Sequence, residues 1–318
     1  MQVAKQSRTG LVVATHGRHV VVESTDGERR ICHPKGKKNQ AVVGDHVRWA
    51  ASEDQGSIEA VEPRRNLFYR QDEIRTKSFA ANIDQTLILL AAEPEFSERQ
   101  LTRALIAAEA QGIAPLIVLN KSDLTDLFQA AWQRLAPYRD MGYTVLGVCL
   151  GRASGTSPSE PDLIRQAALA DLDERLTGKI TLVLGPSGVG KSTLINHWAP
   201  HALAQTNEIS KALNSGKHTT TSTNWYWVDT GKHTALIDSP GFQEFGLHHI
   251  EATQLATLMP DLRRHLGDCK YYNCTHLHEP GCGVTSVLKN ATIAYPISAN
   301  RYKIYSKLFA ELSAVRHW

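Results

Sequence analysis

The feature that most constrains this chain is a phosphate-loop motif that comes directly after an apolar segment. Residues 185–192 read Gly-Pro-Ser-Gly-Val-Gly-Lys-Ser, which matches G-x-x-x-x-G-K-[ST]. The apolar run at 180–184 predicts a buried β-strand, and residues 192–198 have a helical pattern. In this order the loop sets backbone N–H groups at a positive helix N-terminus, where phosphates bind. The motif therefore predicts a nucleotide-binding α/β fold.

The residue types of this loop suit a nucleotide that is bound together with Mg²⁺. The glycines let the main chain wrap around the phosphates. Lys191 can reach the β and γ phosphates, which makes it a catalytic candidate, and Ser192 can ligate the metal ion.

A second motif, Asn120-Lys121-Ser122-Asp123, comes after the apolar strand expected at 115–119. It thus lies at the carboxyl end of a strand, where ligands of open α/β sheets bind. The Asp123 carboxylate can accept hydrogen bonds from guanine N1–H and its amine, whereas adenine would leave it unpaired. Asn120 would brace the loop, and the stem of Lys121 would cover the purine. Alone this motif is often a polar turn, but with the phosphate loop it predicts GTP.

Two further segments suit the switches that sense the γ-phosphate. Asp238-Ser239-Pro240-Gly241 comes after an apolar strand at 233–237, so Asp238 can hold Mg²⁺ through water and the Gly241 N–H can meet the γ-phosphate. Residues 217–221 read Lys-His-Thr-Thr-Thr, and one threonine hydroxyl can complete the Mg²⁺ shell, although a threonine run is also typical of a strand edge.

Phe242 stands where many GTPases have a glutamine that orients the attacking water. We therefore expect slow unaided hydrolysis. His218 is our candidate for the water-positioning group, and an exposed loop histidine without a catalytic role is the alternative.

The order of the motifs is permuted, because the base-reading residues 120–123 precede the phosphate loop at 185–192. A sheet tolerates relocated chain ends, since termini lie at the surface. The new end of the nucleotide-binding unit falls just after Phe242. The C-terminal part of the chain is therefore attached directly to a nucleotide-sensitive loop.

This C-terminal part contains the cluster Cys269-x4-Cys274-x-His276-x5-Cys282. Thiolates and imidazole suit tetrahedral Zn²⁺, and four protein ligands leave no position open for catalysis, so we expect one structural zinc per chain. Reduced thiols in a small core are the alternative, and nearby His278 competes for the histidine position. The spacing of the apolar and aromatic residues further on predicts a packed helix face. These residues are Tyr302, Tyr305, Leu308, Phe309 and Leu312.

Ahead of the nucleotide-binding unit, residues 10–62 read as about five short strands broken by turn signals. They fit an OB-type β-barrel, a fold that often binds RNA, although an SH3-like barrel is also permitted. The loop Lys-Gly-Lys-Lys at 35–38 could meet phosphates or serve as a solvated loop. From residue 80 onwards, apolar strands alternate with helical patterns, which predicts a mostly parallel sheet.

The charge is uneven along the chain. The formal net charge is +3, and by our count residues 1–67 carry +3, residues 68–262 carry −5 and residues 263–318 carry +5. Basic ends favour an anionic partner such as nucleic acid, with ordinary solvated surface as the alternative. No stretch is apolar enough for a signal peptide or a membrane span. We therefore expect a cytoplasmic protein without membrane contact, and as a separate expectation we take it to be a monomer.

Taken together, the permuted order, the segments SGKHTTT and DSPGFQEFGL, the cysteine cluster and the barrel resemble the RsgA-type small-ribosomal-subunit-dependent GTPases. The resemblance covers nearly the whole chain. It implies an OB domain at 1–67 that binds RNA or the ribosome, a circularly permuted P-loop GTPase domain at 68–262 and a zinc-binding α-helical domain at 263–318. It also implies hydrolysis of GTP to GDP and phosphate late in maturation of the bacterial 30S subunit, with 16S rRNA as partner.

The resemblance also implies roles for residues that match the family's motifs. Thr219 or Thr220 would serve as the first switch, with Thr220 catalytic and, like Ser192, a Mg²⁺ ligand; Asp238 and Gly241 would form the second switch. The implied guanine, phosphate and zinc residues are Asn120, Lys121 and Asp123; Gly185, Pro186, Ser187, Gly188, Val189, Gly190, Lys191, Ser192 and Thr193; and Cys269, Cys274, His276 and Cys282.

Two departures from the family pattern stand out. No Ser-Ala signature appears near 148–150, where a second base-contacting segment is expected, so that contact stays unassigned. The N-terminus lacks a long basic extension. Three rival functions are an RNA-binding scaffold locked by nucleotide, a P-loop ATPase or small-molecule kinase, and a permuted GTPase that acts on the large subunit or on another RNA.

Overall fold

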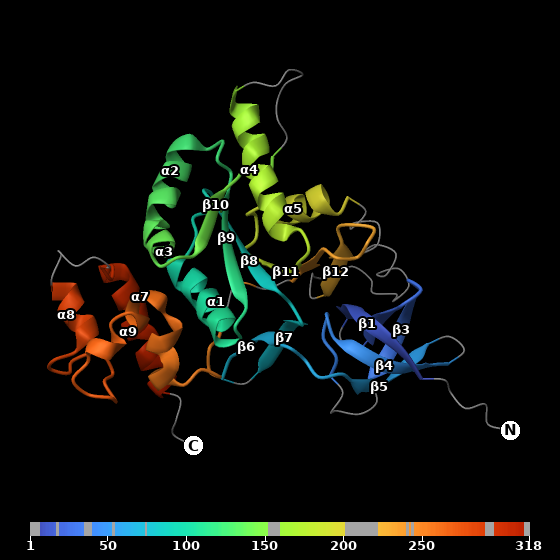
Figure 1. Ribbon diagram of the computed structural model, residues 1–318, viewed down its shortest axis with the longest axis horizontal. Coiled ribbons are helices and arrows are strands. Elements are labelled where there is room, and N and C mark those ends of the chain that lie inside the picture. Colours follow the sequence, from blue (N-terminus) through green and yellow to red (C-terminus); the bar gives the residue numbers. More distant parts are fainter. Residues whose placement is uncertain are drawn as a thin grey trace.

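The chain is described from a computed structural model that covers residues 7–16, 19–34, 40–52, 55–73, 75–151, 160–200, 222–239, 242, 245–289 and 296–314. A barrel, a central α/β unit and a helical C-terminal unit lie side by side across the molecule (Figure 1). The basic loop at 35–38, the threonine run at 217–221 and Gly241 lie outside the described residues.

The N-terminal strands close into a five-stranded barrel. They are β1 (Ser7–His16), β2 (His19–Ser24), β3 (Arg29–Pro34), β4 (His46–Ala51) and β5 (Gly56–Val61). β1 pairs with β2 and β4, β2 pairs with β3, and β5 lies between β3 and β4, parallel to β3. This ring is the five-stranded OB-type barrel and not the SH3-like alternative. Inward-facing residues such as Val22, Trp49 and Ile58 fill it.

The central unit is a six-stranded sheet in the order β10-β9-β8-β11-β13-β12, in which only β12 runs antiparallel. Its strands are β8 (Gln85–Ala91), β9 (Ala114–Asn120), β10 (Thr144–Gly147), β11 (Ile180–Leu184), β12 (Thr223–Trp227) and β13 (Ala235–Asp238). Its helices are α1 (Glu98–Ala110), α2 (Thr125–Arg134), α3 (Ala136–Asp140), α4 (Glu160–Leu176) and α5 (Lys191–Trp198).

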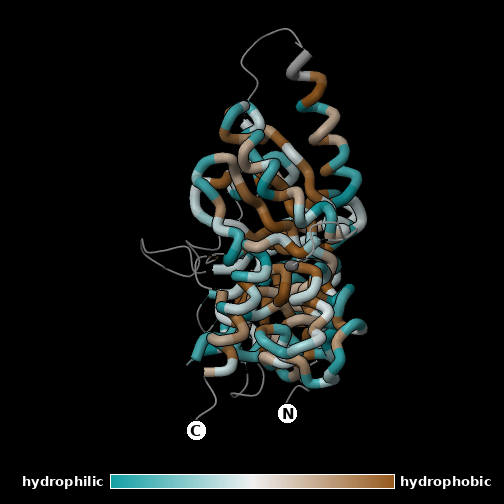
Figure 2. Tube along the Cα trace, turned by 90° about the vertical axis from the view of Figure 1, so that its left-hand side faces the viewer, coloured by the Kyte–Doolittle hydropathy of each residue, from teal (hydrophilic) through white to brown (hydrophobic). Residues whose placement is uncertain are grey.

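The strands are buried on both faces, as a parallel sheet between helices requires. In β8, Ile88 and Leu90 pack in the cluster that includes α1 and α3, whereas Leu87 and Leu89 pack in the cluster that includes α4 and α5. Figure 2 shows hydrophobic residues along these inner strands and many hydrophilic residues on the outer turns.

The barrel and the central sheet are hydrogen-bonded to each other. The end of β1 pairs with the start of β12, where Ala14 lies opposite Asn224 and Thr15 lies opposite Thr223, so eleven strands form one continuous sheet. A separate hairpin of β6 (Leu67–Gln71) and β7 (Thr76–Ala81) lies below the central sheet in the view of Figure 1. A bridge between Val43 and Ala80 joins this hairpin to the barrel.

The C-terminal unit packs against the opposite side of the central unit (Figure 1). It contains η1 (Ala252–Leu258), α7 (Pro260–Arg263), η2 (Leu266–Asp268), α8 (Gly283–Lys289) and α9 (Ala299–Ala314). The expected domain boundary after residue 262 falls within α7. The predicted packed face of α9 is confirmed, since Tyr305, Leu308 and Leu312 are buried.

A buried ion pair fastens α9 to the rest of the molecule. The Arg301 guanidinium donates to both carboxylate oxygens of Asp261, at 2.8 and 3.0 Å, and to the Thr102 hydroxyl of α1 at 2.7 Å. Arg301 is 2% exposed and Asp261 is 7% exposed. None of the helices among the described residues has the length and apolar character needed to cross a membrane.

Candidate nucleotide site and metal centre

The phosphate loop joins β11 to α5 at the carboxyl edge of the central sheet. Gly188 and Gly190 have φ values of +80° and +106°, a left-handed conformation that favours glycine. A Cβ atom at Gly190 would lie 2.5 Å from the Asn120 amide nitrogen, so the loop and β9 approach too closely for any side chain there. The Lys191 ammonium donates to the carbonyls of Gly185 and Pro186, both at 2.7 Å, and so folds back over the loop.

Asn120 connects three segments of this site. It ends β9, and its side-chain amide donates to the Val189 carbonyl of the phosphate loop at 2.8 Å. Its carboxamide oxygen accepts from the Leu150 N–H at 2.9 Å. The structure thus brings the base-reading motif, the phosphate loop and the segment after β10 together through one buried side chain.

The predicted guanine-reading carboxylate lies beside this junction. The Cys149 thiol donates to Asp123 Oδ1 at 3.2 Å, and the Ser122 N–H donates to the Val148 carbonyl at 3.1 Å. Burial, and after it the neighbouring Asp123, raises the pKa of the Cys149 thiol, so it stays protonated and can donate. Residues 148–150, which carried no recognisable signature, therefore border the base-reading loop. The only sequence signal for this segment was one small side chain, Cys149, after β10.

Asp238 ends β13 next to the phosphate loop, and the positive charge of the Lys191 ammonium acts on its carboxyl. Burial raises the pKa of the Asp238 carboxyl and the positive charge of Lys191 opposes that shift. Two buried polar atoms nearby, Ser239 Oγ and Asn224 Oδ1, lack a hydrogen-bond partner among the described residues, and Asn224 lies directly across the ladder from Asp238. Such orphaned acceptors suit the water shell of a hydrated cation.

Phe242, in the proposed second switch, is buried. Its side chain is 4% exposed and packs beside Phe245 in the main apolar cluster, so it does not hydrogen-bond to water. His218, Thr219, Thr220 and Gly241 lie outside the described residues.

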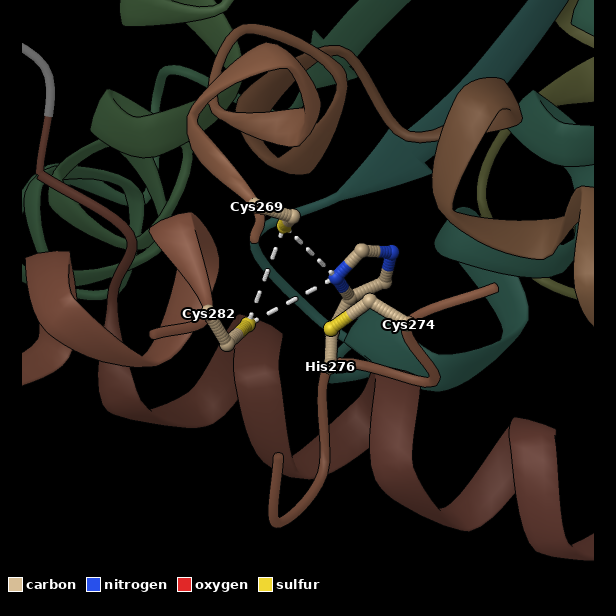
Figure 3. Close-up of side chains that lie close together, drawn as sticks. All are labelled: Cys269, Cys274, His276 and Cys282. Atoms are coloured by element: carbon tan, nitrogen blue, oxygen red, sulfur yellow. Dashed lines mark hydrogen bonds between the residues drawn. The ribbon is translucent and has the colours of Figure 1, made fainter. Parts of the chain in front are cut away.

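The four predicted metal ligands converge between η2 and α8 (Figure 3). The ligand atoms of Cys269, Cys274, His276 and Cys282 all lie within 4.8 Å of one another. His276 Nδ1 is 3.4 Å from the Cys269 sulfur and 3.6 Å from the Cys282 sulfur, and the two sulfurs are 4.0 Å apart. A tetrahedral zinc with bonds of about 2.0–2.3 Å requires ligand atoms about 3.6–3.8 Å apart, so the cluster has the right size.

The loop that carries the histidine is held by Glu279, which the sequence did not single out, and by Tyr302, which was predicted only as a packing residue. Glu279 accepts from the Thr275 and Leu277 N–H groups, at 2.8 and 3.2 Å, and α9 contributes Tyr302, whose hydroxyl donates to the His276 carbonyl at 2.8 Å. Burial lowers the pKa of His276, which keeps the ring neutral, as a metal ligand must be. The competitor His278 is exposed and lies outside the cluster.

A parallel sheet with a phosphate loop after β11 and a base-reading motif after β9, in reversed chain order, defines a circularly permuted P-loop GTPase. The RsgA GTPase family model matches residues 61–248, and the chain belongs to this family. It is therefore a GTP hydrolase.

Relatives and solved structures agree with this assignment. The chain is 66% identical to the small ribosomal subunit biogenesis GTPase RsgA of Variovorax paradoxus, over 97% of this chain and 93% of that protein. It is 50% identical to the protein of that name from Paraburkholderia xenovorans, over 96% and 94%. The crystal structure of YjeQ from Thermotoga maritima matches with a TM-score of 0.67 and 28% identity, over 97% of this chain and 99% of that one. YloQ, described as a circularly permuted GTPase, matches with a TM-score of 0.67 and 25% identity, over 100% and 99%.

Proposed function

We propose that this GTPase binds the 30S ribosomal subunit and acts late in its maturation, hydrolysing GTP to GDP and phosphate while in contact with 16S rRNA. The observation that carries the proposal is the architecture, in which an OB-type barrel and a Cys₃His unit flank one nucleotide sheet. The names of the relatives, which are small ribosomal subunit biogenesis GTPases, support the same partner.

We assign the nucleotide contacts to the residues that converge at the carboxyl edge of the sheet. Asn120, Lys121 and Asp123 read guanine, and the loop from Gly185 to Thr193 binds the phosphates. Mg²⁺ neutralises phosphate charge during hydrolysis. Ser192 and Thr220 would hold it directly and Asp238 through water, which fits the oxygen ligands that Mg²⁺ prefers.

For hydrolysis itself we propose that Lys191 and Thr220 stabilise the reacting phosphate. His218 would orient the attacking water, since the buried Phe242 ring offers no hydrogen bond to it. Thr219 and Gly241 would complete the γ-phosphate contacts. Turnover without the ribosome would then be slow.

We propose that the Cys₃His cluster holds one structural zinc per chain. The ion would crosslink the chain at four points between Cys269 and Cys282 and so keep the C-terminal unit folded. The proposed domains are 1–67, 68–262 and 263–318, and we propose a cytoplasmic monomer.

The test is GTP turnover and co-sedimentation with isolated 30S and 50S subunits. We expect stimulation and binding by 30S subunits alone, with affinity that falls as salt rises because phosphate contacts release counterions. Stimulation by 50S subunits would favour the large-subunit alternative. Binding to 30S without phosphate release would favour a nucleotide-locked scaffold, and equal turnover of ATP would contradict guanine selectivity.

A further inference from the structure

The barrel lies within hydrogen-bonding distance of the strand that comes after the proposed first switch. β12 begins at Thr223, close behind the threonine run at 217–221 in the chain, and its first residues pair with the end of β1. Ala14, Asn224 and Asp238 occupy one row across β1, β12 and β13. Since neighbouring strands are about 4.8 Å apart, two strand spacings, or about 10 Å, separate the barrel backbone from the proposed Mg²⁺ carboxylate.

This junction is closed by one buried carboxylate from the barrel. Glu23 on β2 is 6% exposed, and its two oxygens accept from three donors. The Trp227 indole N–H lies at 2.9 Å and the Lys232 ammonium at 2.6 Å, both from the β12–β13 hairpin, and the Arg29 guanidinium of β3 lies at 2.8 Å. The carboxylate therefore ties two barrel strands to the hairpin of the nucleotide sheet.

The charge state of Glu23 suits such a tie. Burial alone would raise the pKa of its carboxyl, but the hydrogen bonds from Lys232, Arg29 and Trp227 outweigh burial and hold the pKa below its usual value. Charge-assisted hydrogen bonds of this kind are stronger than neutral ones.

Apolar packing also joins the barrel to β12. Val13, Ala14 and Val21 of the barrel share the main apolar cluster with Trp225 of β12, and Trp225 packs edge-on against Trp227 with ring centroids 5.0 Å apart. A displacement of the barrel must therefore move β12 or break this packing, because packed interiors transmit strain.

We infer that Glu23 couples an RNA partner docked on the barrel to β12 and to the Asp238 end of the nucleotide sheet. It acts as a positioning residue only for the turnover that the docked partner stimulates, and basal hydrolysis does not depend on it. This inference rests on the proposed ribosomal function. Coupling between two binding sites is reciprocal. If docked RNA changes the affinity of the sheet for a nucleotide by some factor, that nucleotide must change the affinity of the barrel for RNA by the same factor.

The first experiment needs no ribosome. Hydrogen exchange of residues 7–16 is compared between the GDP form and the form with a non-hydrolysable GTP analogue. We expect the wild-type amides of Ala14 and Thr15 to change protection with the nucleotide, and we expect Glu23→Gln to lose that difference. A wild-type β1 that is indifferent to the nucleotide overturns the inference.

The second experiment measures 30S affinity in both nucleotide states and GTP turnover with and without subunits. In Glu23→Gln we expect the ratio of the 30S affinities in the two nucleotide states to move towards 1 by at least about threefold. We expect the kcat stimulated by 30S subunits to fall about fivefold, whereas basal kcat and KM for GTP stay within about twofold of the wild-type values. Trp227→Phe, which removes one N–H donor and keeps an aromatic ring at this position, should show the same effects more weakly, and it guards against misfolding of the Glu23 variant.

The matched control is Glu62→Gln, which removes an ion pair with Arg48 of β4 at 3.1 Å. It should leave exchange, affinity ratio and stimulation unchanged. The inference is overturned if both Glu23→Gln and Trp227→Phe keep nucleotide-dependent exchange in β1 and are still fully stimulated by 30S subunits. Wild-type protein that 30S subunits fail to stimulate refutes the proposed function instead, and the exchange comparison then decides the coupling alone.

Discussion

Replacing Arg301 by methionine should release α9 from the GTPase unit. The change keeps much of the side-chain volume but leaves Asp261, which is 7% exposed, as an uncompensated buried charge, and it leaves the Thr102 hydroxyl without its donor. Removing one partner of a buried ion pair costs about 3–5 kcal/mol. At about 1.4 kcal/mol for each factor of ten, local opening of α9 should become about two to nearly four orders of magnitude more frequent.

Hydrogen exchange of the α9 amides measures this opening directly. The double variant Arg301→Met with Asp261→Asn should recover most of the loss, because it removes the orphaned charge. The control is Arg99→Met, which breaks a pair with Glu311 of similar length, 2.9 Å, but whose arginine is half exposed. Exposed pairs contribute about 0–1 kcal/mol, so α9 should open no more than about fivefold more often. An Arg301→Met protein that exchanges like the Arg99→Met control would refute the reasoning.

Four further outcomes are expected. Asp123→Asn should weaken GTP and favour a nucleotide whose base has an acceptor where guanine carries its amine, which a competition assay measures; unchanged GTP preference would argue against the assigned contact. Cys274→Ala should lower zinc content and expose residues 263–314 to exchange, and metal-free protein that is fully protected there would exclude the site. Because the pKa of Glu23 is lowered, its carboxylate stabilises the fold at a pH above the ordinary glutamate pKa of 4.5, and this contribution is lost as the pH falls through the folded pKa. Acid should therefore destabilise wild type more than Glu23→Gln, which urea unfolding at a series of pH values measures. His218→Ala should bind 30S subunits yet lose stimulated turnover; full stimulation would reject only the histidine assignment.

The sequence predicted the features that are encoded locally. The phosphate loop, the base-reading motif and the ligand spacing each lie within a short segment whose residue types define the chemistry, and the structure places Cys269, Cys274, His276 and Cys282 together. The permuted order was also readable, because it is the order of motifs along the chain. The barrel strands were predicted from short apolar runs between turns, but their closure into an OB-type ring depends on pairings that a pattern cannot distinguish from those of an SH3-like ring.

Contacts between residues far apart in the chain could not be predicted from the sequence. Asn120 was predicted to brace the base loop, but its bond to Val189 of the phosphate loop depends on how two strands lie side by side. The charge count included one residue that solvent does not reach, since Arg301 belongs to the basic C-terminal flank but is buried and paired within the protein. A count of charged residues does not distinguish buried charges from those that face solvent.

The pairing of β1 with β12 has a consequence for how the chain can be shortened. β12 would be the outer strand of the nucleotide sheet if the barrel were removed, and an unprotected outer strand is a template for pairing with other chains. Its sequence, Thr-Asn-Trp-Tyr-Trp, is aromatic and carries no charge to discourage such pairing. Deleting residues 1–61 should therefore yield an aggregation-prone protein instead of an isolated soluble GTPase, and loss of activity after such a truncation would not by itself report on ribosome binding.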